Sequence, residues 1–209
     1  LALLRSYFRH RQSPGILLST DIMDWFLDDM TRAEKFRFHD YPLNQMFGIQ
    51  SEMPNFMLTM HPLVSKLEGR NYVKRLSRFG VKFDQVLEGL KVREEKGVLP
   101  PKFVIRRVLD EMTAFTGQPA NENPLYTVFK DKLTKLNKVS AVDRESLLAA
   151  AEAEINRTVY PAYQKFSAYF TALEQKATTD DGVWKLPNGD AYYAHCLRSN
   201  TTTGYTPEQ

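Results

Sequence analysis

The chain has four histidines, His10, His39, His61 and His195, and these are its candidate zinc ligands. A hydrolytic zinc site on a helix needs two histidines one turn apart, with an adjacent glutamate as general base. No histidine here has a partner at that spacing, and none is followed by glutamate. The sequence therefore predicts no complete zinc peptidase site within the chain. It predicts that each histidine is a surface or loop residue.

Motifs for nucleophilic catalysis and phosphate binding are also missing from the sequence. There is no Gly-x-Ser-x-Gly elbow and no glycine-rich phosphate loop. Cys196 directly follows His195, but neighbouring residues on a strand point to opposite faces, so we expect a buried and unreactive thiol. Acid pairs such as Asp28-Asp29 and basic pairs such as Arg106-Arg107 are typical of solvated helix faces.

The segment 189–203 is dense in polar donors and directly follows a turn signal. One interpretation is a ligand-facing strand edge, on which Arg198 would bind a carboxylate. The other, which composition favours, is ordinary strand propensity with amphipathic packing, because Tyr and Thr favour strands. Neither interpretation assigns a catalytic or a metal-binding residue. The candidate substrate-binding residues are Tyr192, Tyr193, Arg198 and Thr202.

Helical periodicity dominates the residues that must position this segment. Residues 39–63 contain four proline or glycine breaks and indicate a long connection with short helical pieces. The longest predicted helix begins at Ser140 and runs for roughly 35 residues, with a kink or split at Pro161. Short links between the helices favour antiparallel neighbours. The other expected helices are an amphipathic stretch over 1–11, one capped by Thr20 or Asp21, 66–79 ended by Gly80, 81–96 ended by Gly97, one from Pro100-Pro101 to Gly117, and one that Asn123-Pro124 begins.

After Ala177 the pattern changes and favours a β-hairpin. Its arms would be 183–186 and 191–195, joined through Asn188-Gly189, because both turn residues accept a positive φ. The second arm could equally be a helix. The predicted fold is thus mainly α: an antiparallel, bundle-like helical array with one long Pro-kinked helix and a small β-hairpin near the C-terminus. We expect one partial domain over 1–209, helical over 1–177, strand-like over 182–203, with a truncated helix start at 206–209.

Composition is that of an ordinary globular protein, with 43% hydrophobic and 25% charged residues. The net charge of +3 is too small to argue for nucleic acid as a partner. No apolar run is long enough to cross a bilayer. The single cysteine excludes an internal disulfide but leaves the compartment open.

Thr206-Pro207-Glu208 has the pattern of a helix start, with a cap, a proline at the first position and an acid in the first turn. No apolar residues follow it. We therefore expect the chain to be a piece of a longer protein, against whose C-terminal part it packs. Its exposed apolar surface should make it self-associate.

Several short runs, taken in order, resemble the bacterial domain of unknown function 885 (DUF885) family, whose members are often described as lipoproteins. The most specific block comprises Gly182–Tyr193, Leu197-Arg198, Thr201–Thr203 and Thr206-Pro207-Glu208. Weaker matches are His39–Gln45 with Gly48, His61-Pro62-Leu63, Gly97–Pro101 and Val159–Tyr163.

The resemblance implies a mostly helical protein similar to gluzincin-type zinc metallopeptidases. In that family the His-Glu helix comes after the Thr-Pro-Glu stretch, so no zinc ligand is carried over onto this chain, and zinc would belong to the longer parent. A periplasmic or membrane-anchored lipoprotein is implied in the same way.

Two functional hypotheses follow from these observations. In the first, the chain is part of a zinc-metallopeptidase-like protein, contributing a helical scaffold and part of a cleft wall that contacts a peptide substrate. In the second, it is a non-catalytic helical scaffold or a protein- or peptide-binding module.

Overall fold

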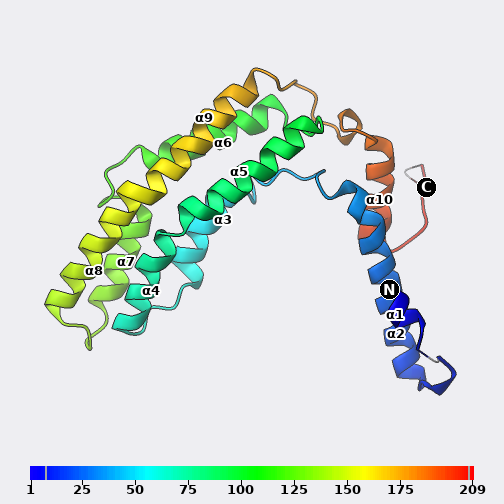
Figure 1. Ribbon diagram of the computed structural model, residues 1–209, viewed down its shortest axis with the longest axis horizontal. Coiled ribbons are helices and arrows are strands. Elements are labelled where there is room, and N and C mark those ends of the chain that lie inside the picture. Colours follow the sequence, from blue (N-terminus) through cyan, green and yellow to red (C-terminus); the bar gives the residue numbers. More distant parts are fainter. Residues whose placement is uncertain (8, 207) are drawn as a thin grey trace. The chain divides into compact units, whose positions relative to one another are not determined.

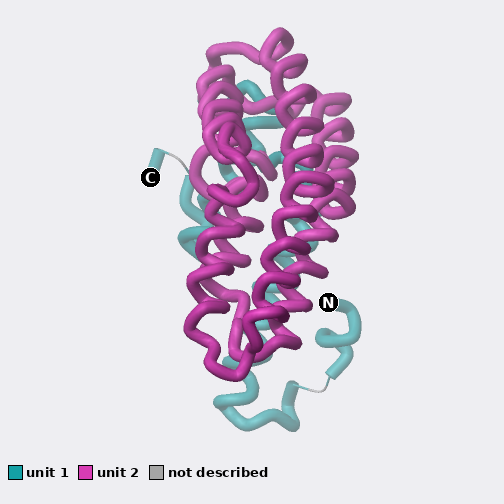
Figure 2. The backbone as a smooth tube through the Cα atoms, turned by 90° about the vertical axis from the view of Figure 1, so that its left-hand side faces the viewer, with its two compact units in different colours: residues 1–40, 182–209 teal, residues 41–181 magenta. Residues whose placement is uncertain are grey.

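The computed structural model describes residues 1–7, 9–206 and 208–209, and these fall into two compact units (Figure 1, Figure 2). Unit 1 contains residues 1–40 and 182–209, and unit 2 contains residues 41–181. All regular secondary structure in the described ranges is helical, which confirms a mainly α protein. The expectation of one partial domain over residues 1–209 stays a prediction.

Unit 2 is an antiparallel helical array, in which the chain makes three long passes (Figure 1). The first pass comprises α4 and α5, the second α6 and α7, and the third α8 and α9. Helices α5 and α6 both pack against α9, while α4 and α7 pack against α8. The bounds are α3 (Ile49–Asn55), α4 (Lys66–Leu76), α5 (Phe79–Glu95), α6 (Lys102–Thr116), α7 (Pro124–Thr134), α8 (Ala141–Glu154) and α9 (Tyr160–Glu174).

Side-chain caps explain where several of these helices begin. Ser65, Asn123 and Ser140 each accept a hydrogen bond from a backbone N–H in the first turn of the helix that follows. Gly97 has a φ of 73° just after α5, as expected for a glycine that stops a helix. The prediction that Gly80 ends a helix was wrong: α4 ends at Leu76, and Gly80 lies inside α5.

The long helix predicted from Ser140 is present, and a widened turn divides it before Pro161. Helix α8 passes directly into the π-helical turn Ile155–Val159 and then into α9. The N–H of Tyr160 donates to the carbonyl of Ile155, five residues back. A proline ring opposes the carbonyl four residues before it, and a wider turn is a common way to accommodate it.

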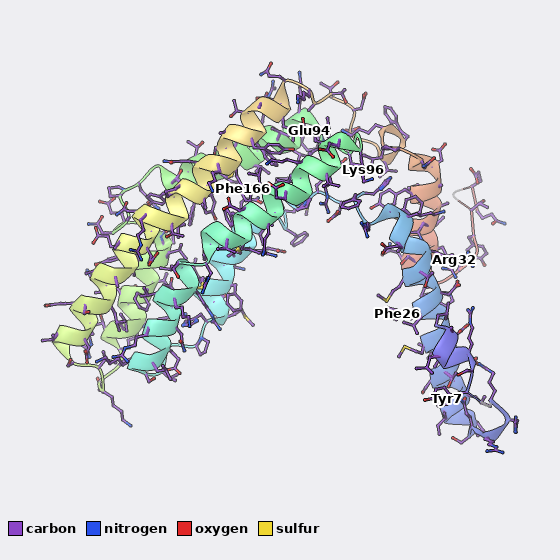
Figure 3. The ribbon with its side chains drawn as sticks, in the orientation of Figure 1. Tyr7, Phe26, Arg32, Glu94, Lys96 and Phe166 are labelled. Carbon is purple, nitrogen blue, oxygen red and sulfur yellow. The ribbon has the colours of Figure 1, made fainter. Side chains whose placement is uncertain are left out.

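Aromatic rings from several helices fill the core of unit 2. Phe166 on α9 stacks on Phe83 of α5, with ring centroids 4.4 Å apart (Figure 3). Tyr72 on α4 stacks on Phe129 of α7 at 4.2 Å. Burial of apolar surface drives the packing of these helices, and ring pairs of this kind also prefer particular mutual orientations. They therefore help to fix the orientation of one helix against the next.

A buried tyrosine compensates for the proline inside α3. Pro54 has no N–H, so it cannot bond to the carbonyl of Gln50 four residues back. The hydroxyl of Tyr163 on α9 donates to that carbonyl instead. Burial raises the pKa of Tyr163 well above its ordinary value, so the hydroxyl keeps its proton and remains a donor. This bond ties α3 to α9.

Unit 1 consists mainly of α2 (Pro14–Ala33) and α10 (Gly189–Thr201), with the short α1 (Ala2–Arg5) beside α2. The prediction that Thr20 or Asp21 caps the second helix was wrong. The cap position is Ser13, and Pro14 takes the first helical position, where its missing N–H costs nothing. Of the stretch predicted over 1–11, Phe8 lies outside the described residues. Pro207, in the predicted helix start at 206–209, does so as well.

The predicted β-hairpin was wrong. Its first arm is the 3₁₀ turn Val183–Lys185, and its second arm lies in α10. Asn188 does take a left-handed conformation, with a φ of 54°, but it precedes a helix rather than joining two strands. A Cβ atom on Gly189 would lie 2.2 Å from the carbonyl oxygen of Val183, so only glycine allows the helix to begin so close to that turn.

We predict that Tyr163→Phe lowers the free energy of unfolding by about 1–3 kcal/mol, because it leaves the Gln50 carbonyl buried without a donor. In a Pro54→Ala background the loss should be smaller, since alanine restores the N–H that bonds to the same carbonyl. The double-mutant cycle compares the wild type, the two single variants and the double variant. Their free energies of unfolding are measured by chemical denaturation, followed by far-UV circular dichroism. Equal losses in the two backgrounds would contradict the assignment.

Candidate functional site

Helix α10 carries the residues that the sequence singles out, but the structure does not bring all of them together. Tyr192 and Arg198 are half-buried within unit 1. Tyr193 is 46% exposed. Thr202 follows the helix in a left-handed conformation and is exposed. Tyr192 and Arg198 belong to two neighbouring clusters on α10, which meet where Nδ1 of His195 lies 3.9 Å from the carboxylate of Asp29.

The first cluster surrounds Arg198 and links α10 to α2. The guanidinium donates to Asp29, which is 7% exposed, and more weakly to Asp28 at 3.5 Å. It also lies 5.1 Å from the ring of Trp25. A buried carboxylate needs such a partner. The interactions of Arg198 within unit 1 are therefore structural, and the prediction that it binds a ligand carboxylate stays a prediction.

The second cluster contains two imidazole rings and Tyr192 around the buried Phe36. The ring centroids of His39, Tyr192 and His195 lie 5.3, 5.4 and 5.5 Å from that of Phe36. Nε2 of His39 is 2.7 Å from the carbonyl oxygen of Pro187. Because a carbonyl only accepts, this nitrogen carries the proton. In the neutral ring Nδ1 is then an acceptor, and it is buried without a partner among the described residues.

These rings line a cavity of about 300 Å³. Tyr192, His195, Cys196 and Ser199 follow one another at intervals of three, one and three residues, so they share one face of α10. The expectation that Cys196 and His195 point to opposite faces was therefore wrong, because the segment is helical. Cys196 is half-buried rather than buried. The remaining residues of the wall are Ala33, Phe36, Arg37, His39, Asp40 and Asn200.

The cavity's donor set does not fit a metal ion. No group of three or more His, Cys, Asp or Glu side chains in the described ranges is arranged to hold one. His61 lies elsewhere, in the loop of unit 2 that precedes α4, so it is a loop residue as predicted, although it is only 3% exposed. The prediction was wrong for His195, which lies inside α10 and is half-buried. Nε2 of His61 donates to the carbonyl of Glu68, and Arg75 donates to its Nδ1. Burial lowers the pKa of His61, consistent with a neutral ring.

A family model described as a bacterial protein of unknown function (DUF885) matches residues 1–209. The chain belongs to this family. The expected family resemblance is thereby confirmed.

A solved structure with a similar fold is that of a protein from Colwellia psychrerythraea, described provisionally as a lipoprotein. The TM-score is 0.78 at 25% sequence identity, and the match covers 81% of this chain and 29% of that one. The match thus spans less than a third of the length of that neighbour. The comparison with curated proteins found no match. Among the described residues no helix combines the length and apolarity needed to cross a membrane.

We predict that Asp29→Asn destabilises unit 1 by about 1–2 kcal/mol, because it removes the charge that Arg198 meets in a nearly buried position. Trp25 and Trp184, the two tryptophans of the chain, both lie in unit 1, so tryptophan fluorescence reports its unfolding. Asp24→Asn is the matched control, since its partner Arg5 is exposed and the loss should be smaller. Equal shifts for both variants would contradict a structural role for Asp29.

Proposed function

We propose that this chain is the helical part of a larger, zinc-peptidase-like DUF885 protein, and that the α10 cavity belongs to the surface that contacts a peptide substrate. One observation carries the proposal. The block with the most specific family resemblance, 182–208, supplies the 3₁₀ turn and α10, and α10 forms one wall of the cavity. Tyr192 from this block, and His39 and Asp40 from a weaker matching run, line the cavity, which favours a role in binding over a role in core packing alone.

The cavity wall offers the groups that a peptide backbone requires. His39 contributes its ring to the wall, held through Nε2 by the carbonyl of Pro187, whereas its Nδ1 is buried and out of reach of a peptide. The phenol of Tyr192 can donate to a carbonyl. Arg198 holds α10 against α2 through Asp29, so its contribution in this proposal is to position the wall.

Zinc in this proposal would be held outside residues 1–209. When bound, it would activate water and polarise the peptide carbonyl. His39, His195 and Cys196 share the cavity but do not form a group that could hold the ion. No catalytic step is therefore assigned to the described residues.

The test uses the longer protein that contains this chain, with elemental analysis for zinc and a peptide library for cleavage. We expect bound zinc, and cleavage that a chelator abolishes and added zinc restores. Tyr192→Phe should raise KM severalfold with kcat unchanged, because it removes one polar contact to substrate. The exposed Tyr205→Phe is the matched control. A protein that binds no zinc and cleaves no peptide would reject the proposal.

A second candidate function, a non-catalytic scaffold, is favoured by the exposed face of α2. Besides Leu18, five large apolar side chains on this helix are each about half exposed or more, and the spacing of these five places them in one stripe. They are Ile16, Ile22, Met23, Phe26 and Met30; Figure 3 labels Phe26. In this alternative the stripe is covered by other parts of the same longer protein, and the chain serves as a docking module.

We predict that the 209-residue chain self-associates and binds an apolar dye through this stripe. Met23→Lys with Met30→Lys should reduce both effects, because two charges interrupt the apolar surface. Sedimentation velocity and dye fluorescence measure the change. Val142→Lys, at an isolated apolar position of α8 that is 75% exposed, is the control. A compact wild-type monomer that leaves the dye dark would contradict an exposed docking face.

A further inference from the structure

Unit 2 contains a second cavity, which is separate from the α10 site in unit 1. It has a volume of about 440 Å³, within the range of pockets that hold small molecules. The corner between α4 and α5 forms one side, and α3 with the π-helical turn Phe56–Met60 forms the other. Met53, Met57 and Phe79 provide an apolar interior. Met57 and Phe79 are almost fully buried, whereas Met53 is half-buried.

The rim of this cavity is basic. Arg75, Arg78 and Lys82 follow each other at intervals of three and four residues and all line it, against a single carboxylate, Glu52. Arg75 is already engaged: it donates to His61, and its guanidinium lies 5.3 Å from the ring of Phe56. A neutral His61 adds no competing positive charge there.

Two of these cations remain available to a ligand. Arg78 and Lys82 are exposed, and within the part of the chain that the structure describes their side chains make neither an ion pair nor a hydrogen bond. Placing two unneutralised cations at the mouth of an apolar cavity favours a molecule with an anionic end and an apolar tail. A purely apolar ligand would leave the cations unused, and a compact anion would leave the interior unfilled.

We propose that this cavity binds a single-chain aliphatic carboxylate of the fatty-acid type. The tail lies among Met53, Met57 and Phe79, where the flexible methionines adapt to its shape. The carboxylate meets Arg78 and Lys82 at the rim, where Arg offers a paired set of donors. This site does not depend on the proposed peptidase function, because it lies in unit 2 and uses none of the α10 residues.

Calorimetric titration of the 209-residue chain with decanoate, decan-1-ol and decyltrimethylammonium tests the head group. The two ions are used below their micellar concentrations and the alcohol below its solubility limit. We expect saturable binding of decanoate at one site, binding of the alcohol at least tenfold weaker, and no binding of the cation. Added salt should weaken decanoate binding, because the ion pairs at the rim are exposed. Equal binding of acid and alcohol, or no saturation, would overturn the proposal.

Variants test the location. Arg78→Gln with Lys82→Gln should weaken decanoate binding by about tenfold and leave the alcohol unchanged. Lys135→Gln with Lys138→Gln removes the same charge from exposed positions outside the cavity wall, and should have little effect. Met53→Trp, which fills the interior, should weaken both ligands, with thermal unfolding confirming that the variant is folded. Unchanged binding in the rim variant overturns the site.

A final arm asks whether another part of the protein occupies the cavity. The titration is repeated with the longer protein that contains this chain. Decanoate binding in both forms supports a ligand site. Binding to the 209-residue chain alone would mean that another segment covers the cavity, and this result would also overturn the proposal.

Discussion

The packing of unit 2 depends on one constraint: buried main-chain carbonyls that lack a helical N–H must find a side-chain donor. Pro54 creates such a carbonyl at Gln50, and Tyr163 satisfies it. The same requirement recurs where helices end. The further donors are Asn123 to Phe115, Tyr160 to Gln118 and Lys132 to Leu58, and Tyr72 adds a bond to the helical carbonyl of Leu125. Because each bond joins residues distant in sequence or in different elements, together they fix the register of helices that apolar packing alone would allow to slide.

Most helices of unit 2 could be predicted from local signals, and the exceptions have physical reasons. Some signals act within one turn of the helix, so they can be recognised from the sequence. These are the caps at Asn123 and Ser140 and the glycine stop at Gly97. Gly80 gave the same signal and was misleading. Its neighbour Phe79 is 1% exposed, and burying that ring at the start of α5 outweighs the flexibility of one glycine. Tertiary packing of this kind leaves no local pattern.

The candidate site was only partly predictable for a similar reason. Asn188-Gly189 correctly indicates a positive φ, but the same dipeptide suits a hairpin and a helix start. The helical spacing of Tyr192, His195, Cys196 and Ser199 is the signal that would have decided for a helix, and aromatic strand propensity obscured it. Asp29 lies 169 residues before its partner Arg198 on α10, and His39 lies 148 residues before its partner Pro187, just ahead of that helix. No spacing rule links residues at that separation.

Two widened turns next to prolines show why one irregularity yields a cavity and the other does not. At Phe56–Met60 the N–H of His61 bonds five residues back, to Phe56, shortly after Pro54. At Ile155–Val159 the same geometry comes shortly before Pro161. A π turn holds more residues than an α turn and so pushes side chains outward. Ile155 and Val159 are fully buried and their turn is filled by core, whereas Phe56 is 46% exposed and borders the basic cavity. The difference lies in what packs against each turn, so a widened turn beside a proline is not by itself enough to form a cavity.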